Sequence, residues 1–251
     1  MASQIPENVV IEYGLVSFAD VCNKKTLISD TVKVNDLFLD SWWFAIRTRW
    51  LKLSIIDYAK YVQKHWNTYN VIANMDTNSI EETIENQEFL EKETGKYILP
   101  VYHWEDFVKW DYKWFEEFCE KYNYIGLWGI AGSHYKKEFI EKYFNFCFTI
   151  WKKYKTKFHW FWVTSDYFLK KYPFYSVDST SWLSGLRFMT VDYFKQWKLY
   201  SMNAGECRKL LWIDIAKLPR AEKVRRSLDA RKKYNEYMTK LHQAKWMEYR
   251  L

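Results

Sequence analysis

The chain has 251 residues, of which 49% are hydrophobic and 21% aromatic, so it can bury a large core. No run approaches the roughly 18 apolar residues of a membrane span, and the N-terminal stretch lacks a signal-peptide pattern. We therefore expect a cytoplasmic protein with no membrane partner. The four cysteines are far apart and form none of the close pairs typical of zinc sites, so we predict no metal and no cofactor.

Apolar runs alternate with helical patterns along most of the chain. Ser79 and Glu82 have the spacing of a capping box, and Gly95 is a typical helix stop. Cys119 and Cys147 fall on apolar helix faces and are predicted to be buried thiols. Strands are predicted at 9–19, 36–40, 69–76, 98–103, 124–129, 157–163, 174–178 and 186–191. Helices are predicted at 53–66, 79–94, 106–121, 135–154, 165–172 and 219–250.

The alternation indicates an α/β protein. Strands that are apolar throughout are typical of sheets covered on both faces. Seven or eight βα units predict a single (β/α)8 TIM-type barrel, complete or incomplete, with a long basic C-terminal helix. A doubly wound open sheet is the alternative, although no glycine-rich nucleotide motif is present. We expect a barrel domain at 1–215 and a basic helical extension at 216–251.

Polar residues follow the predicted strands at their C-terminal ends, where barrel enzymes place their chemistry. Converging carboxylates perform acid–base or nucleophilic work when burial and mutual repulsion separate their pKa values. Each aspartate alone is equally explained as a helix cap or a turn residue. His103 is also compatible with a polar role under a helix start, and His159 with either face of its strand. The candidates are Asp40, Asn74, Asp76, His103, Gly126, Gly129, His159 and Asp178.

Positive charge is concentrated at the C-terminus. The segment 217–251 has eleven Lys or Arg and four acidic residues, so it accounts for the whole net charge of +7. This predicts a surface that binds a polyanion. A solvated helix without a ligand, or a helix that pairs with a second copy in a homodimer, fits the same pattern. The candidate contacts are Arg220, Lys223, Arg225, Arg226, Arg231, Lys232 and Lys233.

Several strand ends together resemble a known family. The stretch 39–44 (LDSWWF) resembles the L-D-S-G-[GA]-F motif of tRNA-guanine transglycosylases and of their phage-borne relatives that insert 7-deazaguanines into DNA. The stretch 71–76 (VIANMD) is similar to the next strand of that family, 124–129 (YIGLWG) to its L-G-G turn, and 159–165 (HWFWVTS) to H-G-x-G-x-[TS]. The stretch 176–182 (SVDSTSW) resembles the shorter phage branch.

This resemblance implies a TIM barrel that exchanges a nucleobase in DNA or tRNA. An aspartate attacks C1′ of a guanosine, guanine leaves, and a 7-deazaguanine displaces the aspartate. Asp178 takes the nucleophile role on the phage-branch pattern, with Asp40 as the rival and second catalytic carboxylate. Asp76 binds the incoming base. The other implied substrate-binding residues are Asn74, Ser41, Gly126, Leu127, Trp128, Gly129, His103 and His159. The zinc cluster of the tRNA enzymes has no counterpart here.

Tryptophan stands where these motifs have glycine. Fifteen tryptophans accompany only seven glycines, and Trp42, Trp128, Trp160 and Trp162 occupy motif positions, with Trp50 and Trp104 as further cases. One hypothesis is that UGA codons read as glycine were translated as tryptophan. A second is that the protein is an inactive nucleic-acid-binding barrel whose pocket is filled by the tryptophan side chains. A third is that the tryptophans stack on bases.

A glycosidase that only removes the base is a further functional alternative.

Overall fold

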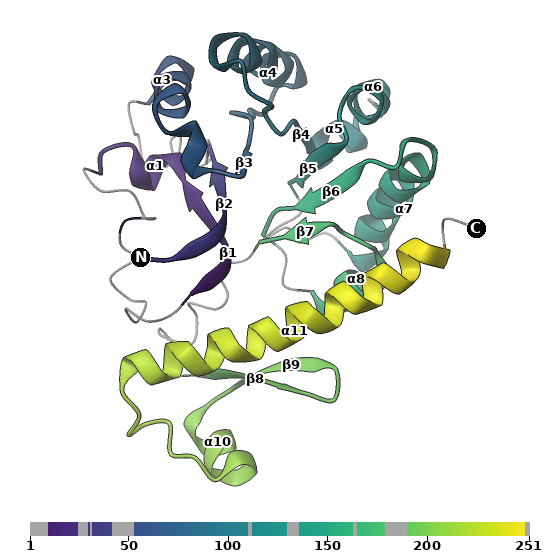
Figure 1. Cartoon of the computed structure of the whole chain (residues 1–251). Helices are drawn as coiled ribbons and strands as arrows, with labels where there is room; N and C mark the ends of the chain where they lie inside the picture. Colours follow the sequence, from purple (N-terminus) through teal and green to yellow (C-terminus); the bar gives the residue numbers. More distant parts are fainter. Residues whose placement is uncertain are drawn as a thin grey trace. The chain divides into compact units, whose positions relative to one another are not determined.

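The computed structural model describes residues 10–24, 30, 32–41, 53–109, 112–129, 136–162, 165–178 and 190–248 (Figure 1). The chain divides into two compact units, Val10–Phe161 and a unit that contains the chain from Trp162 onward. Each unit is described by itself. The domain boundary expected at residue 215 falls inside the second unit.

The strands of the first unit follow the apolar runs of the sequence. Every described pairing among them is parallel, as in an α/β fold. All six strands predicted up to residue 163 are confirmed, most of them shorter than predicted. They are β1 (Ile11–Ser17), β2 (Val34–Asp40), β3 (Val71–Ile72), β4 (Val101–His103), β5 (Tyr124–Trp128) and β6 (Lys157–Trp160).

Local capping explains where helices begin and end. Ser79 Oγ accepts a hydrogen bond from the Glu82 amide, and Gly95 ends that helix in the left-handed conformation at φ 62°. The helix predicted at 106–121 is wrong, because two helices form. The first begins directly after β4, where Trp104 enters the core. The helices are α1 (Phe18–Val21), α3 (Ile55–His65), the 3-10 turn η3 (Trp66–Thr68), α4 (Ile80–Thr94), α5 (Trp104–Val108), α6 (Lys113–Lys121) and α7 (Lys137–Tyr154).

The strands of the first unit pair in the order of the sequence. One group runs β1-β2-β3 and another β4-β5-β6, and a parallel bridge between Ala73 and Leu99 connects them. A doubly wound sheet reverses its strand order at a switch point. The described strands show no such reversal.

This sheet is strongly curled. The rings of Phe38 in β2 and His159 in β6 lie 4.7 Å apart between centroids. Across a flat sheet, four strand spacings would separate them by roughly 19 Å. The strands therefore bend around a common inner side, and the helices of this unit lie on the outer side (Figure 1).

The core of the first unit lies between the curled sheet and its helices. Leu37 and Leu39 of β2 pack with the helix residues Tyr58 and Val62 in one apolar cluster. Aromatic rings dominate the other half of this layer, where Tyr102 of β4 lies 4.8 Å from Phe115 of α6. Cys119 and Cys147 are buried there, as predicted.

The second unit contains an antiparallel hairpin that the sequence patterns did not predict. Val191 pairs with Met202, and Lys195 pairs with Lys198 on either side of a two-residue turn. Most of the strand predicted at 186–191 lies outside the described residues. The elements are α8 (Asp166–Lys171), β7 (Ser176–Val177), β8 (Val191–Lys195), β9 (Lys198–Met202), α10 (Ala204–Leu211) and α11 (Arg220–Glu248).

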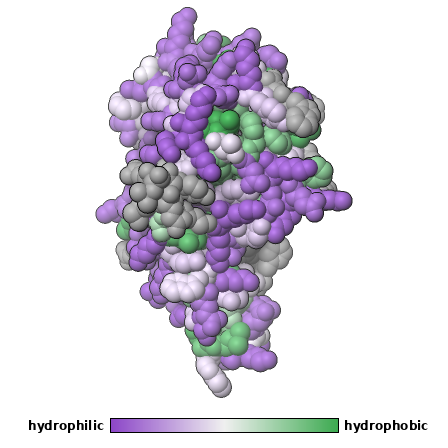
Figure 2. Space-filling view, turned by 90° about the vertical axis from the view of Figure 1, so that its right-hand side faces the viewer, coloured by the Kyte–Doolittle hydropathy of each residue, from purple (hydrophilic) through white to green (hydrophobic). Residues whose placement is uncertain are grey.

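The long helix α11 confirms the helix predicted at 219–250, and polar contacts attach it to the hairpin. Arg231 Nε donates to the carboxylate of Asp192, which is 5% exposed, and Ser227 Oγ accepts from the Asp192 amide. Within the described residues, none of the helices combines the length and apolar character needed to cross a bilayer. Hydrophobic residues on the face seen in Figure 2 form small separate patches in a largely hydrophilic surface.

Candidate functional site

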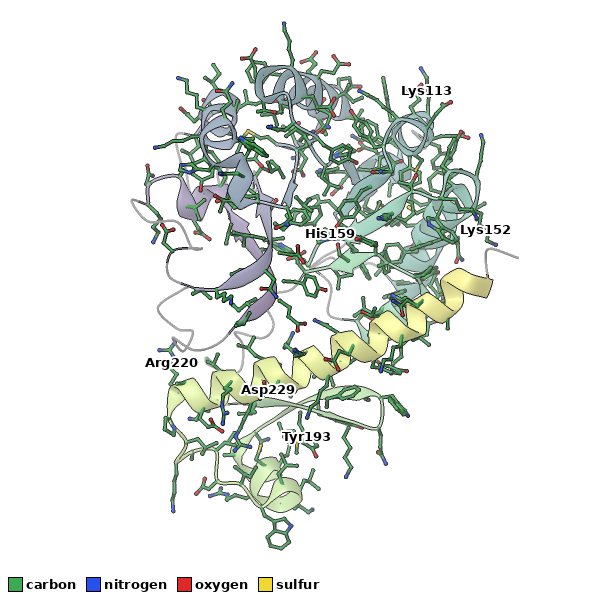
Figure 3. All side chains as sticks on the ribbon, viewed as in Figure 1. Lys113, Lys152, His159, Tyr193, Arg220 and Asp229 are labelled. Atoms are coloured by element: carbon green, nitrogen blue, oxygen red, sulfur yellow. The ribbon has the colours of Figure 1, made fainter. Side chains whose placement is uncertain are left out.

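His159 lies on the inner side of the curled sheet. Alternation along β6 turns Phe158 and Trp160 toward the helices, where Trp160 lies 4.3 Å from Phe144 of α7. His159 therefore faces inward, toward Phe38 and toward Phe161 at 4.4 Å (Figure 3). The two orientations left open by the sequence are thus resolved in favour of the inner side.

Gly126 permits close packing at this inner face. A β-carbon at Gly126 would lie 2.6 Å from Cε2 of Phe161, closer than packed atoms approach. The glycine therefore lets an aromatic ring lie against β5. Gly129 has φ 101°, and a β-carbon there would lie 2.7 Å from a carboxylate oxygen of Glu105. Both glycines of the predicted turn are required by the backbone and its neighbours, while Leu127 is fully buried.

Asp40 ends β2 two residues after Phe38, on the same face of the strand. It is 9% exposed and lies in register with Ser17 at the end of β1. The next residue, Ser41, is fully buried, and its hydroxyl has no hydrogen-bond partner within the described residues. The C-terminal end of β2 thus presents a carboxylate and a hydroxyl, as the sequence predicted.

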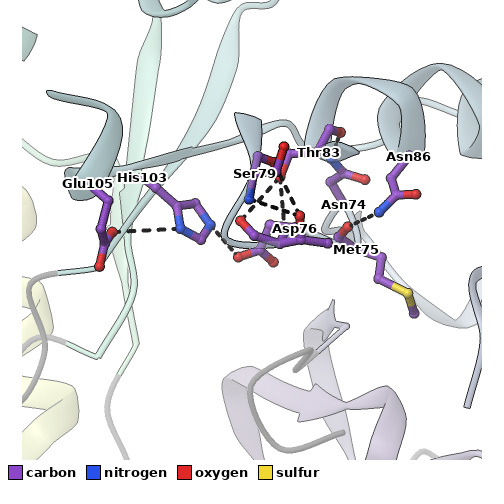
Figure 4. Close-up of polar contacts among 9 residues, drawn as sticks. Asn74, Met75, Asp76, Ser79, Thr83, Asn86, His103 and Glu105 are labelled. Carbon is purple, nitrogen blue, oxygen red and sulfur yellow. Dashed lines mark hydrogen bonds and ion pairs between the residues drawn. The ribbon is translucent and has the colours of Figure 1, made fainter. Parts of the chain in front are cut away.

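Asp76 follows β3 and is held by His103 at the end of β4. His103 Nε2 lies 2.6 Å from Asp76 Oδ2, and Nδ1 lies 3.8 Å from Glu105 Oε2 (Figure 4). Burial disfavours the charged imidazole, but the hydrogen bond and charge of Asp76 outweigh it, so the pKa of His103 is raised. The pair brings together two residues that the sequence proposed separately.

Asn74 fixes the same strand end to helix α4. Its amide nitrogen donates to the Thr83 carbonyl at 2.7 Å, and its backbone amide donates to Leu99. The Asn74 side-chain oxygen is buried and has no hydrogen-bond partner among the described residues. One buried acceptor is therefore left beside Asp76.

Asp40 and Asp76 lie at the C-terminal ends of β2 and β3, which pair in parallel. Burial raises the pKa of the Tyr58 hydroxyl, and the charges of Asp40, Tyr69 and Asp76 add to the rise. That hydroxyl donates to the Ala73 carbonyl at 2.7 Å. Two of the three predicted aspartates therefore lie at the ends of two paired strands.

Asp178 lies in the second unit, directly after β7. Its Oδ1 accepts a hydrogen bond of 2.9 Å from the backbone amide of Trp162. Trp162 has φ 62°, a conformation that glycine adopts readily and bulky residues rarely adopt. The neighbouring motif residues 179–182 lie outside the described residues.

The tryptophans at the other motif positions differ from Trp162. Trp128 and Trp160 have ordinary backbone conformations, and Trp104 is buried with its ring 5.2 Å from Tyr143. Their backbones impose no need for glycine. Trp42 and Trp50 lie outside the described residues.

The basic candidates on α11 differ in their contacts and in their exposure to solvent. Arg231 is engaged with Asp192, and both Arg225 and Arg226 form ion pairs with Glu222. Lys223 is half-buried, whereas three residues are exposed along the helix: Arg220, Lys232 and Lys233.

Sequence reasoning missed Glu105 and Asp106, which follow His103 directly. Asp106 is 3% exposed, and burial raises its pKa although the charge of His103 opposes the rise. The sequence did contain a signal for them, because two acidic residues follow closely after the histidine that ends a predicted strand. Within the described residues, no group of three His, Cys, Asp or Glu side chains is arranged to hold a metal ion.

Comparisons with known proteins add no family assignment. The chain matches no protein-family model, no curated protein and no solved structure.

Proposed function

We propose that this chain is a nucleobase-exchanging transglycosylase that replaces guanine in DNA or tRNA with a 7-deazaguanine. The observation that carries the proposal is that Asp40 and Asp76 lie at the ends of adjacent parallel strands, β2 and β3, in a curled, consecutively ordered sheet. Strand ends of such sheets are where barrel enzymes position catalytic groups. We further propose that the sheet belongs to a TIM-type barrel.

In the proposed reaction, a carboxylate oxygen of Asp178 attacks C1′ of the target nucleoside. The bond from C1′ to N9 of guanine breaks, and a protonated acid, assigned to Asp40, delivers the proton that the leaving base requires. The backbone amide of Trp162 donates a hydrogen bond to Asp178 Oδ1 and so orients this carboxylate. N9 of a 7-deazaguanine then attacks C1′, the N9 proton passes to the Asp40 carboxylate, and the bond from C1′ to the Asp178 oxygen breaks. A target base in a duplex must first be flipped out.

Asp76 is assigned to base recognition. A guanine-like base presents N–H donors on its Watson–Crick edge, and a carboxylate accepts from such donors. The hydrogen bond between His103 and Asp76 fixes one oxygen of that carboxylate. The side-chain oxygen of Asn74, which has no hydrogen-bond partner among the described residues, offers a second acceptor.

The decisive experiment measures incorporation of labelled guanine into DNA and tRNA. Asp178→Asn should reduce exchange by about 10³-fold or more, as loss of a nucleophile does. Asp229→Asn, on the exposed surface of α11, serves as the matched control and should exchange normally. Full exchange by Asp178→Asn would refute the nucleophile assignment.

Trapping distinguishes the two rival nucleophiles. A covalent protein–nucleic-acid adduct on a denaturing gel should form with Asp40→Asn and be lost with Asp178→Asn. The reverse pattern would transfer the nucleophile role to Asp40. Release of guanine without incorporation of a new base would select the glycosidase alternative.

The second candidate function is nucleic-acid binding without catalysis. The exposed basic residues Arg220, Lys232 and Lys233 on α11 favour it. Salt-dependent binding of DNA or tRNA with no base exchange and no adduct would select this alternative.

A further inference from the structure

Three tryptophans adopt a left-handed backbone. They are Trp162 at φ 62°, Trp197 at φ 63° and Trp212 at φ 58°. In this conformation the β-carbon of an L-residue crowds the backbone, so glycine is the residue that adopts it without cost. Only two other non-glycine residues in the described chain have positive φ, Lys155 and Gln196. Tryptophan is thus concentrated where a bulky residue is least expected.

Trp212 occupies a position that glycine fills elsewhere in this chain. It ends α10 at φ 58° and ψ 29°, and Gly95 ends α4 at φ 62° and ψ 23°. A left-handed helix cap is most often glycine. The Trp212 side chain is 92% exposed, so little burial of its indole offsets the backbone cost. Lys155 caps α7 in the same conformation, but a charged lysine side chain is well solvated when it is exposed to water.

Trp197 occupies the second position of a two-residue hairpin turn. Gln196 and Trp197 both have positive φ, at 50° and 63°, and connect β8 to β9. This turn type takes its second residue most often as glycine. The Trp197 indole is 64% exposed and rests on Tyr237 at 5.1 Å.

Other tryptophans of the chain have the burial or the backbone conformation that is usual for tryptophan. Trp104 and Trp151 are each 2% exposed, lie in helices, and have ordinary φ. Trp66 is 46% exposed but has φ −53°. Within the described part of the chain, the tryptophans therefore fall into two classes: those with an ordinary backbone conformation and those with a left-handed one.

We infer that residues 162, 197 and 212 are glycines in the natural protein, encoded by UGA codons that its translation system reads as glycine. Average usage predicts about 18 glycines in a chain of this length, and seven are printed. The inference extends the recoding hypothesis to two turn positions that no family motif covers. It assigns true tryptophan to residues 104 and 151, so both codons occur in one gene.

The consequence at residue 162 concerns the candidate nucleophile. Glycine keeps the amide that donates to Asp178 Oδ1 and removes the indole from the residue that holds this carboxylate. Substrate would then approach Asp178 past a bare backbone. This consequence rests on the proposed function, whereas the codon assignment does not.

Reading the gene tests the inference directly. UGA is expected at residues 162, 197 and 212, and UGG at 104 and 151. UGG at any of the first three overturns the inference for that residue, and UGG at all three overturns it altogether. UGA at 104 or 151 would show that codon identity does not follow backbone conformation, which also overturns the argument.

Equilibrium unfolding of the full chain tests the physical premise. Trp197→Gly and Trp212→Gly should each lower the unfolding equilibrium constant by about fivefold to thirtyfold, since left-handed strain is relieved. Trp66→Gly, exposed but right-handed, is the matched control and should raise that constant. Equal destabilisation by all three substitutions would overturn the premise whether or not the protein exchanges bases.

Discussion

At the residue scale, the pair of His103 and Asp76 is the most informative contact. A nearly buried histidine is expected to lose its proton, yet the carboxylate 2.6 Å away raises its pKa. The pair therefore links the ends of β3 and β4 through a charge that depends on pH.

The pH dependence of stability follows from the sign of this shift. His103 has a higher pKa in the folded chain than in the unfolded chain, whose value is about 6.5. Its contribution is thus fully present below that value and is lost as pH rises through the folded pKa. His103→Gln should cost about 1.5–3 kcal/mol at pH 5.5 and less at pH 9, measured by urea unfolding. An equal cost at both pH values would contradict the assignment.

Gly126 should resist substitution for steric reasons. Gly126→Ala places a β-carbon 2.6 Å from the Phe161 ring and should destabilise the chain by about 1–3 kcal/mol. A double-mutant cycle provides the control. In the Phe161→Leu background the same alanine should cost less, because the obstructing ring atoms are gone. Strict additivity of the two changes would contradict the packing argument.

At the element scale, α11 depends on one internal charge pair. Asp192 is buried beneath the helix, and Arg231 is its charged partner. Arg231→Ala should cost about 3 kcal/mol in urea unfolding, since it leaves a buried carboxylate without that partner. Lys233→Ala, exposed on the same helix, should change stability by about 0.5 kcal/mol or less. Similar values for both variants would contradict a stabilising role for the pair of Asp192 and Arg231.

The elements also show what sequence patterns can predict. Strands β1 to β6 were recognisable because each is a largely apolar run bounded by polar loops or helical patterns. The hairpin of β8 and β9 was missed because its turn reads Gln196-Trp197, without the glycine that marks such turns. Helix α10 was also not predicted, although Asn203 and Glu206 form a capping box at its start.

The candidate site was predictable in parts. Strand-end position singled out Asp40, Asp76 and His103, and the structure places the last two in contact. The partnership itself was not predictable, because it depends on side chains of two successive strands reaching the same point. The inward orientation of His159 likewise required the observed packing of its neighbours against α7.

At the scale of the whole molecule, the +7 charge predicts binding to nucleic acid through the exposed residues of α11. Lys232→Ala and Lys233→Ala should each lower the slope of log affinity against log salt by about 1, with little sequence preference. Lys113→Ala, in the first unit and exposed, should leave the slope unchanged. Titration of fluorescent DNA and tRNA at several salt concentrations measures these slopes. Equal effects of all three lysines would indicate diffuse attraction instead of a binding surface.

The contact between Phe38 and His159 has a consequence for how the chain folds during synthesis. Strands β1 to β6 pair in the order in which they are made, so each can join the growing sheet as it emerges. The inner ring contact must wait for β6, which is made last in its unit. Phe38→Leu should therefore accelerate unfolding and leave the refolding rate nearly unchanged. Assembly of this unit would then be progressive, with its central aromatic contact formed as the final step.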